Sequence, residues 1–342
     1  DVIFDSTYFK SRDAKGGYHY LLEDIIGLDA HERFSEAAES AILTEALKTS
    51  YEEASKVIPS KTEITKTTVM NKVHGIAKEV PVTEVDERKK CEYLFIEADE
   101  DHVAEQHGKK RKENKGFISR LAYVYEYKQE NPKIKGRKEL VNTYYFSGLY
   151  EGSTGVQRFW EEVQKFIEKN YDTEYLKKVF VLGDGASWIK SVTTYVDKSL
   201  YCVDKFHMTK YINAAANQML DEAEMAKENL YRFIYKKQKS KFKKYTEEML
   251  LSAGNPEVII ELQKYALGNW EAVMRSYHNE LITGCSAEGH VSHILSERLS
   301  SRPMGWSQTG ADRMSKLRCY ERNHGREKII DLVRYSREKR LL

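Results

Sequence analysis

The order of strand-like and helix-like segments between Cys91 and Asp204 most constrains the fold of this chain. Three segments rich in aromatic and β-branched residues come first, at 92–99, 118–128 and 140–146. A helical period then covers 155–170, and two short apolar strands at 178–182 and 200–203 follow, with a helix predicted at 186–196 between them. A helix that joins two strands favours parallel pairing, so we predict an α/β fold with a mixed sheet.

Helical composition dominates the rest of the chain. Residues 1–88 are predicted to be helical, and two segments there, 50–58 and 63–77, have the arrangement of a helix-turn-helix, although most such pairs only pack on each other. DNA contact by residues 1–88 therefore stays open. Three strands followed by crossovers is the ribonuclease-H-like order. We predict a ribonuclease-H-like core in 89–207, an all-helical insertion in 208–282 and the C-terminal helices of the core in 283–342.

The composition excludes several classes of protein. No run of 18 or more apolar residues is present, which argues against a membrane span. The four cysteines lie far apart without a C-x-x-C pair, which argues against a zinc ribbon or a disulfide scaffold and favours a reducing cytoplasm. The chain begins without Met and without a signal sequence, so we expect it to be part of a longer protein.

Acidic residues gather where the predicted strands end. Asp184 lies between two glycines after the apolar strand 178–182, and Asp99 follows the first strand with Asp101 and His102 close behind. The carboxyl ends of parallel strands commonly face ligands, and crowded carboxylates are stabilised by a divalent cation. The alternatives are a helix N-cap for Asp184 and a solvated acidic loop for the other run, within which Asp101 competes with Asp99.

Two further motifs carry titratable side chains. Asp204 and His207 follow the last predicted strand in a D-x-x-H spacing, which offers too few ligands for a structural zinc and favours a supporting role. Glu288 begins a predicted helix. An acid in the first turn also interacts favourably with the helix dipole, which is the alternative explanation for this residue.

Taken together, these motifs resemble those of a known group of proteins. They read EADEDHV at 97–103, GDGASWI at 183–189, CSAEGHV at 285–291 and SSRPMGWS at 300–307, with the D-x-x-H at 204–207. This combination is similar to that of the ISLre-type insertion-sequence transposases of bacteria, which are also grouped as an uncharacterised protein family. More distantly it resembles the Mutator-like transposases. The likeness covers essentially the whole chain.

The resemblance implies an Asp-Asp-Glu triad of Asp99, Asp184 and Glu288 that is catalytic and holds Mg²⁺ or Mn²⁺, with two ions expected. It implies supporting roles for Asp101, His102, Asp204 and His207. The implied activity is that of a DNA transposase, a polynucleotidyl transferase that cuts double-stranded DNA at element ends and joins it to target DNA. We expect a homo-oligomer in the bacterial cytoplasm. The alternatives are a ribonuclease-H-like nuclease or resolvase that does not join strands, and a non-catalytic DNA-binding relative.

Basic clusters supply candidate DNA contacts, although the net charge of the chain is only +2. Residues 232–244 hold seven basic residues and no acid, 313–340 hold ten basic residues against four acids, and 109–115 and 133–138 are also basic. Such clusters can neutralise phosphates, and the alternative is a solvated helix face. The candidates are Arg232, Lys236, Lys237, Lys241, Lys243, Arg302, Arg313, Lys316 and Arg318. Trp306 is a candidate for stacking on a base or, alternatively, for packing beneath a helix.

Overall fold

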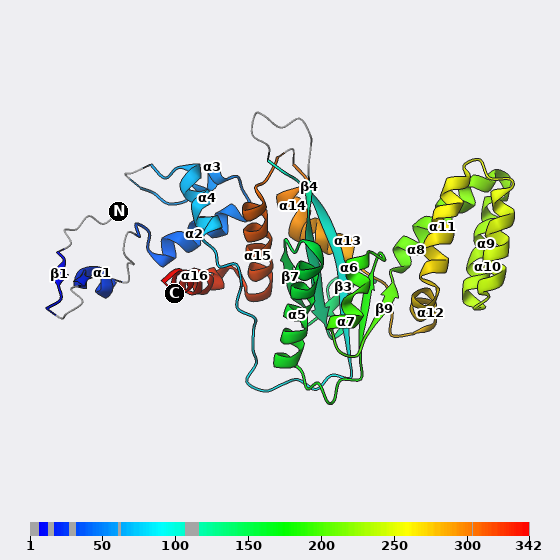
Figure 1. The fold of residues 1–342 in the computed structure, drawn as a ribbon, viewed down its shortest axis with the longest axis horizontal. Helices are drawn as coiled ribbons and strands as arrows, with labels where there is room; N and C mark the ends of the chain where they lie inside the picture. Colours follow the sequence, from blue (N-terminus) through cyan, green and yellow to red (C-terminus); the bar gives the residue numbers. More distant parts are fainter. Residues whose placement is uncertain are drawn as a thin grey trace. The chain divides into compact units, whose positions relative to one another are not determined.

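The computed structural model describes residues 7–12, 17–26, 32–60, 63–106, 116–302 and 304–341 (Figure 1). The basic segment 109–115 lies outside the described residues. The chain divides into two compact units, which are considered separately below. Unit 1 comprises Asp1–Pro81, Val103–Phe117 and Glu297–Leu342, and unit 2 comprises Val82–His102 and Ile118–Ser296. The sequence-based boundaries at 88 and 283 differ from this division.

Unit 2 is built on a five-stranded mixed sheet in the order β7-β4-β3-β8-β9. The strands are β3 (Tyr93–Ala104), β4 (Gly116–Tyr125), β7 (Tyr144–Gly148), β8 (Lys178–Gly183) and β9 (Ser199–Val203). β8 pairs in parallel with both β3 and β9, whereas β4 pairs antiparallel with β7. The predicted mixed α/β sheet with parallel crossover strands is confirmed.

Two of the predicted strands are each divided in the structure. β5 (Tyr127–Glu130) and β6 (Lys138–Val141) form a separate antiparallel hairpin, so 118–128 spans β4 and β5, and 140–146 spans β6 and β7. Asn142 has φ of 54°, a left-handed conformation that ends β6 and that asparagine adopts more readily than most residues. Residues 133–137 of the basic segment lie in the connection between β5 and β6, and Lys138 begins β6.

One face of the sheet packs against α5 (Gly152–Asn170) (Figure 1). Leu94, Ile96 and Ala98 of β3 share a hydrophobic core with buried α5 residues such as Trp160. Because strand side chains alternate between faces, the odd-numbered residues of β3 point to the other side. The helix predicted at 186–196 is two short helices, α6 (Ser187–Lys190) and α7 (Val192–Tyr195).

The other face of β3 is linked by hydrogen bonds to the segment that contains α13 (Ala287–Val291) and the π-helical turn η2 (Ser292–Ser296). Between β9 and this segment the chain is helical. The helices are α8 (Lys205–Ala216), η1 (Asn217–Glu222), α9 (Ala223–Tyr235), α10 (Lys239–Leu250), α11 (Pro256–Gly268) and α12 (Trp270–His278). Ser276 of α12 donates to the Val203 carbonyl at 2.6 Å, which fastens the helical block to β9.

Unit 1 is mainly helical. Its elements are a small hairpin of β1 (Phe9–Lys10) and β2 (Tyr18–His19), then α1 (Leu21–Ile26), α2 (Glu36–Ala46), α3 (Tyr51–Ala54), α4 (Lys66–His74), α14 (Glu297–Leu299), α15 (Gln308–His324), η3 (Arg326–Lys328) and α16 (Ile329–Leu341). The predicted helix 50–58 is only the single turn α3, and residues 55–65 separate it from α4. The tight turn of the expected helix-turn-helix is therefore not formed by this pair.

Across the described ranges, none of the helices has both the length and the apolar composition that a bilayer crossing requires.

Candidate functional site

Asp99 and Asp184 lie side by side at the carboxyl edge of β8. β3 and β8 are parallel neighbours, and Glu97 is opposite Leu182, so the register brings Asp99 opposite Asp184. In the same way, Val203 of β9 pairs with Gly183, and the N–H of Asp204 donates to the Gly183 carbonyl at 2.9 Å. Asp184 and Asp204 directly follow β8 and β9, whereas Asp99 lies within β3, which continues to Ala104 beyond the strand end expected at residue 99. The parallel register nevertheless brings the three acids to one edge of β8 and β9.

The two glycines around Asp184 are required for different reasons, Gly183 by close packing and Gly185 by its backbone conformation. A Cβ at Gly183 would lie 2.7 Å from Ile189 and 3.0 Å from the Ala98 carbonyl. Gly185 has φ of 98°, which side-chain-bearing residues rarely adopt. This turn directs the chain away from β8 immediately after the carboxylate.

Asp99 is an acid in an unfavourable place for a negative charge. Burial, together with the charge of Asp184, raises its pKa from 3.8 to about 6, while the N–H of Glu100 and the nearby His207 partly offset the shift. Asp99 accepts that N–H at 2.8 Å. Two carboxylates held together in this way are the arrangement that a divalent cation would stabilise.

Asp184 does not form the N-cap bond that was the alternative explanation for it. Its Oδ1 accepts the N–H of Ala186 at 2.9 Å, in a local turn, and Ala186 is itself the N-cap residue of α6. The carboxylate thus shapes the loop after β8 at the edge where Asp99 lies.

Asp204 and His207 form a pair at the start of α8. Asp204 is the N-cap of that helix and accepts the Phe206 N–H at 2.9 Å, and its other oxygen lies 3.1 Å from Nδ1 of His207. The hydrogen bond to Asp204 raises the pKa of His207, and the charges of Asp204, Asp184 and Asp99 act in the same direction against burial. The D-x-x-H pair thus places a cation-forming ring beside the two strand-end acids.

Glu97 is a functional candidate that the sequence analysis did not single out. It is fully buried and accepts hydrogen bonds from Tyr123, Tyr125 at 2.7 Å, Lys128 at 2.7 Å, and both the N–H and the hydroxyl of Ser286 at 2.6 and 2.9 Å. Burial alone would raise the pKa of Glu97, but these donors, Lys128 above all, hold it below its ordinary value. The available signal was a lone acid within the apolar run 94–98 of a strand.

The segment from Ser286 to Ser296 is fixed to β3 on both sides of Asp99. Ser286 binds Glu97, and the hydroxyl of Ser296 donates to the buried Asp101 at 3.0 Å. Glu97, Asp99 and Asp101 share one face of the strand because side chains alternate. Asp101, the competitor of Asp99 in the sequence analysis, is therefore an anchor for η2.

Glu288 is an exposed residue in the first turn of α13. Within the described ranges, hydrogen bonds and ion pairs do not join it to Asp99 or Asp184, and no group of three or more His, Cys, Asp or Glu side chains among those residues is arranged to hold a metal ion. His102 is also exposed and lies 3.7 Å from Glu100. The structure thus brings together two members of the expected triad and places the third on the segment fixed beside them.

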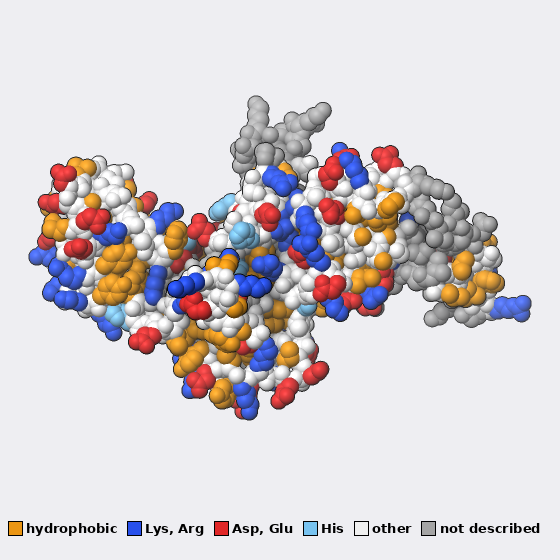
Figure 2. All heavy atoms as spheres, turned by 180° about the vertical axis from the view of Figure 1, so that it is seen from behind, with side chains coloured by type: hydrophobic (Ala, Val, Ile, Leu, Met, Phe, Trp, Pro, Cys, Tyr) orange, Lys and Arg blue, Asp and Glu red, His pale blue; other side chains and the backbone are white. Residues whose placement is uncertain are grey.

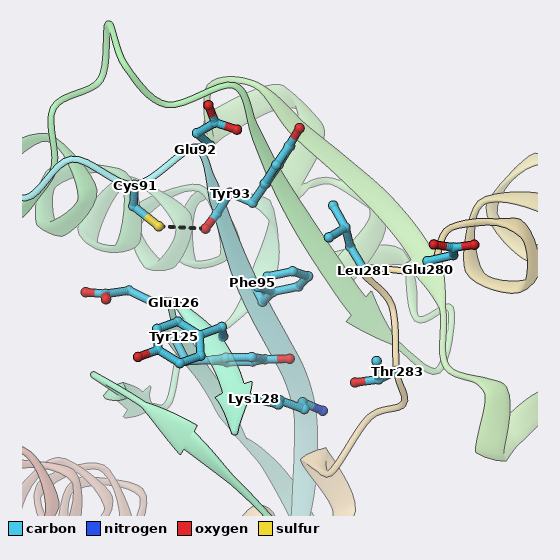
Figure 3. Close-up of a pocket in the computed structure, with 11 residues that line it drawn as sticks. Cys91, Glu92, Tyr93, Phe95, Tyr125, Glu126, Lys128, Glu280, Leu281 and Thr283 are labelled. Atoms are coloured by element: carbon cyan, nitrogen blue, oxygen red, sulfur yellow. Dashed lines mark hydrogen bonds between the residues drawn. The ribbon is translucent and has the colours of Figure 1, made fainter. Parts of the chain in front are cut away.

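A pocket of about 350 Å³ lies further back along the same face of β3 (Figure 3). Phe95 and Tyr125 form part of its lining, and their rings stack at 5.4 Å. Its charged residues are three glutamates and Lys128, and Lys128 is bound to Glu97. The excess of acids makes this pocket unsuited to a phosphate group.

The predicted DNA contacts in unit 2 are exposed. Arg232 lies in the last turn of α9, Lys236 and Lys237 follow that helix, and Lys241 and Lys243 lie on α10. Lys243 lies 3.7 Å from Glu247, in an exposed pair that contributes little to stability. Figure 2 shows Lys and Arg side chains gathered over the α9 and α10 region, on the left of the view.

Three of the predicted contacts in unit 1 have protein partners, and the fourth, Arg302, is exposed. Arg313 pairs with Asp312, Lys316 donates to the Lys78 carbonyl at 2.6 Å, and Arg318 donates to the Leu47 carbonyl at 2.6 Å. Each of these three side chains is at most 15% exposed. These three members of the basic run 313–340 are therefore held by internal contacts, whereas Arg322, Arg326, Lys328, Arg334, Lys339 and Arg340 of the same run are exposed.

Trp306 is 6% exposed and packs within unit 1. The guanidinium of Arg298 lies 4.7 Å from its ring centre, and Tyr51 meets it edge-on at 6.0 Å. The structure therefore favours the packing alternative for this residue over base stacking.

Comparison with known proteins assigns the chain to a family. The profile of an uncharacterised protein family, UPF0236, matches residues 1–335. The chain belongs to the UPF0236 family. Among its relatives are UPF0236 proteins of Caldanaerobacter subterraneus subsp. tengcongensis, which are 34% and 35% identical over 328 and 329 residues, or 95% of this chain. The chain spans 66% of the length of each of these relatives.

Among solved structures, the UPF0236 chain aligns with a protein of the Drosophila P element transposase strand transfer complex. The TM-score is 0.27 at 10% identity, with 94% of this chain and 84% of the other covered. A likeness this weak carries no argument about fold or function.

Replacing Asp99 by Asn is expected to stabilise the metal-free UPF0236 chain at neutral pH. The raised pKa means that the folded state loses stability as pH rises from 3.8 through about 6, when Asp99 ionises. Asn keeps the acceptor for Glu100 without the charge, so the free energy of unfolding should rise by about 3 kcal/mol near pH 7.5. Urea titrations near pH 7.5 and pH 4 measure the change. A gain of the same size at both pH values would contradict the explanation.

Proposed function

We propose that this chain carries the catalytic region of a bacterial insertion-sequence transposase, which cleaves DNA at the element ends and joins them to target DNA. The observation that carries the proposal is the pairing of Asp99 and Asp184 at the carboxyl edge of two parallel neighbouring strands. Phosphoryl transfer from DNA needs carboxylates that hold divalent cations, and partly buried acids that repel each other are costly without such a role.

The sheet supports a ribonuclease-H-like assignment for unit 2. Its first three long strands, β3, β4 and β7, are neighbours in sequence order, and β8 and β9 add to the opposite side of β3 in parallel. This is the order expected from the sequence. The helical block between β9 and α13 then corresponds to the insertion before the last acid.

The attachment of α13 supports Glu288 as the third acid. The segment that bears it is fixed to Glu97 and Asp101, the residues two positions before and after Asp99 on the same face of β3. A chain segment held at both of these points passes beside Asp99. A shift of α13, or another rotamer of Glu288, would bring the Glu288 carboxylate closer to the two aspartates. The side chain of Glu288 is exposed, so it has room to move.

The donor chemistry fits magnesium or manganese. Asp99, Asp184 and Glu288 would supply only carboxylate oxygens, the hard ligands that these ions prefer, and its surroundings raise the pKa of the partly buried Cys285 well above that of a free thiol. When bound, such ions supply charge stabilisation and an activated hydroxyl for in-line attack on a phosphodiester. Asp204 orients His207 at the same edge, where the ring can hold a proton beside the reacting groups.

The distribution of the relatives agrees with a mobile element. The name of one UPF0236 relative joins eleven locus names of a single bacterium, and that of another joins four. Many loci that encode one protein are what repeated transposition would leave in a genome.

A strand-joining assay tests the proposal. The full-length protein is incubated with labelled element-end DNA and a target plasmid, in Mg²⁺ or Mn²⁺ and in EDTA. We expect metal-dependent cleavage followed by covalent joining of the labelled strand to the plasmid. Cleavage without joining would replace the proposal by a nuclease or resolvase, and binding without either reaction would replace it by a DNA-binding function.

Replacing Lys241 or Lys243 by Ala is expected to weaken DNA binding equally for all sequences. Both side chains are exposed on α10, within the run that contains no acid, so each can neutralise one phosphate. The slope of log affinity against log salt should fall by about 1 for each phosphate that is no longer neutralised. Fluorescence anisotropy at several salt concentrations measures it. Lys178→Ala, an exposed lysine at the amino end of β8, is the control, and a slope equal to that of the control would contradict the assignment.

A further inference from the structure

A groove of about 590 Å³ lies between α8, α9 and α12 in unit 2. Three tyrosines, Tyr231, Tyr235 and Tyr277, line it, and we call them the tyrosine cluster. The remaining lining residues are Lys205, Thr209, Glu224, Lys227, Glu228 and Arg232. The proposed roles of the carboxylate edge, which is formed by Asp99 and Asp184, and of the basic run 232–244 do not involve these aromatic side chains.

The tyrosine cluster offers exposed aromatic surface on a fixed base. Tyr277 lies 5.6 Å from Tyr235, edge to face, and 6.5 Å from Tyr231. The hydroxyl of Tyr231 donates to Thr209 at 2.9 Å, which ties α9 to α8. Tyr235 is 59% exposed. An aromatic ring held in place by its neighbours and open to solvent is suited to stacking on a planar ligand.

The position of the groove connects it to the carboxylate edge. Lys205, at one end of the lining, is the residue directly after Asp204 and lies with its ammonium group 5.6 Å from the Tyr277 ring centre. Arg232 and Tyr235, also in the lining, are followed by the exposed Lys236 and Lys237 of the basic run. The lining of the groove therefore includes both a residue next to Asp204 and the first residue of the basic run.

The charges of the groove favour one kind of ligand. Three basic side chains are present, but Glu224 and Glu228 offset two of them. With three basic and two acidic side chains, the groove has too little net positive charge to bind a duplex through its phosphates alone. A tyrosine ring can stack on a base only where that base is exposed, as it is in an unpaired strand. Proteins that bind single strands combine a moderately positive groove with aromatic side chains on which bases stack.

We propose that the tyrosine groove binds unpaired nucleotides of a DNA strand, with Tyr235 stacking on a base and Lys205, Lys227 and Arg232 contacting the backbone. The proposal rests on the proposed function for its biological setting: the bound strand is the single-stranded end that extends from the carboxylate edge during cleavage and joining. The binding itself requires no divalent ion and no reaction.

The test measures binding of a fluorescein-labelled oligodeoxythymidylate of about 15 nucleotides to the full chain in EDTA. The wild-type protein should bind it, and an unlabelled single strand should compete better than a blunt duplex of equal length. Loss of one base stack should lower the affinity of Tyr235→Ala about tenfold, whereas Tyr235→Phe, which keeps the ring, should bind as the wild type does. Tyr175→Ala, which removes a 46% exposed tyrosine elsewhere in unit 2, is the matched control.

A crosslinking experiment locates the bound strand. Oligonucleotides with 5-iododeoxyuridine at successive positions are irradiated with the protein, and the attached peptide is identified by mass spectrometry. We expect crosslinks to Tyr235, with Tyr231 and Tyr277 as neighbours. Absence of oligonucleotide binding, equal affinity of Tyr235→Ala and the wild type, or duplex competition as strong as that of the single strand would each overturn the proposal. A protein that binds through Tyr235 but neither cleaves nor joins DNA would instead refute only the proposed function.

Discussion

Asp184→Asn is expected to lower strand joining by about a thousandfold or more while the protein still folds and binds DNA. Asn has nearly the same volume and keeps the Oδ1 acceptor for the Ala186 N–H, so the turn after β8 is preserved. The substitution removes the negative charge that would hold a divalent ion beside Asp99. Joining and cleavage rates in Mg²⁺ measure the effect, with circular dichroism and DNA anisotropy as checks on fold and binding.

Two further variants make this experiment decisive. Asp197→Asn changes an exposed acid before the amino end of β9, away from the carboxylate edge, and should react as the wild type does. Glu288→Gln should lose activity to a similar extent with unchanged stability, because Glu288 is exposed. Turnover of Asp184→Asn at the wild-type rate would refute the catalytic assignment. Full activity of Glu288→Gln alone would leave the aspartate pair in place and remove Glu288 from the triad.

The position of the aspartate pair was predictable because it depends on strand order alone. If the strand that ends at Gly183 and the strand that contains Asp99 are parallel neighbours in matching register, Asp184 and Asp99 lie side by side, although β3 itself continues to Ala104. The sequence contains both signals within short segments. The same alternation that marks a strand also separates Glu97, Asp99 and Asp101 from Ala98 and Leu94.

Features that depend on distant partners were not predictable in this way. Whether Arg318 faces solvent or the Leu47 carbonyl depends on packing between segments far apart in the chain, and the charge run around it looks the same in both cases. Trp306 is a similar case, since its burial comes from Tyr51 and Arg298. The break at Asn142 was missed because residues on both sides of it have strand composition.

Glu97→Ala is expected to destabilise the protein by about 3–5 kcal/mol and to abolish strand joining, although Glu97 is not proposed to touch DNA or metal. The substitution removes the carboxylate that accepts from Tyr123, Tyr125 and Lys128, and it leaves the Lys128 ammonium, whose side chain is 14% exposed, with the Gly284 carbonyl at 2.8 Å as its acceptor. It also frees Ser286, the residue directly before α13. Urea titration measures the stability, and the joining assay measures the consequence for the site.

The pair Glu97 and Lys128 allows the charge effect to be separated from the anchoring effect. Glu97→Gln combined with Lys128→Gln removes both charges and keeps side chains that can hydrogen-bond, so it should regain part of the stability that either single change loses. Ser286→Ala removes the hydroxyl bonds to Glu97 at 2.9 Å and to Tyr123 at 3.1 Å and should cost about 1–2 kcal/mol, since the N–H still donates to Glu97. If α13 is held mainly by Glu97, joining should decline in the order Ser286→Ala, then the double variant, then Glu97→Ala. If Glu97→Ala lowered the free energy of unfolding by less than about 1 kcal/mol, the hydrogen bonds to Glu97 would not be important for stability. The segment that contains α13 would then be held to β3 mainly through the bond between Ser296 and Asp101.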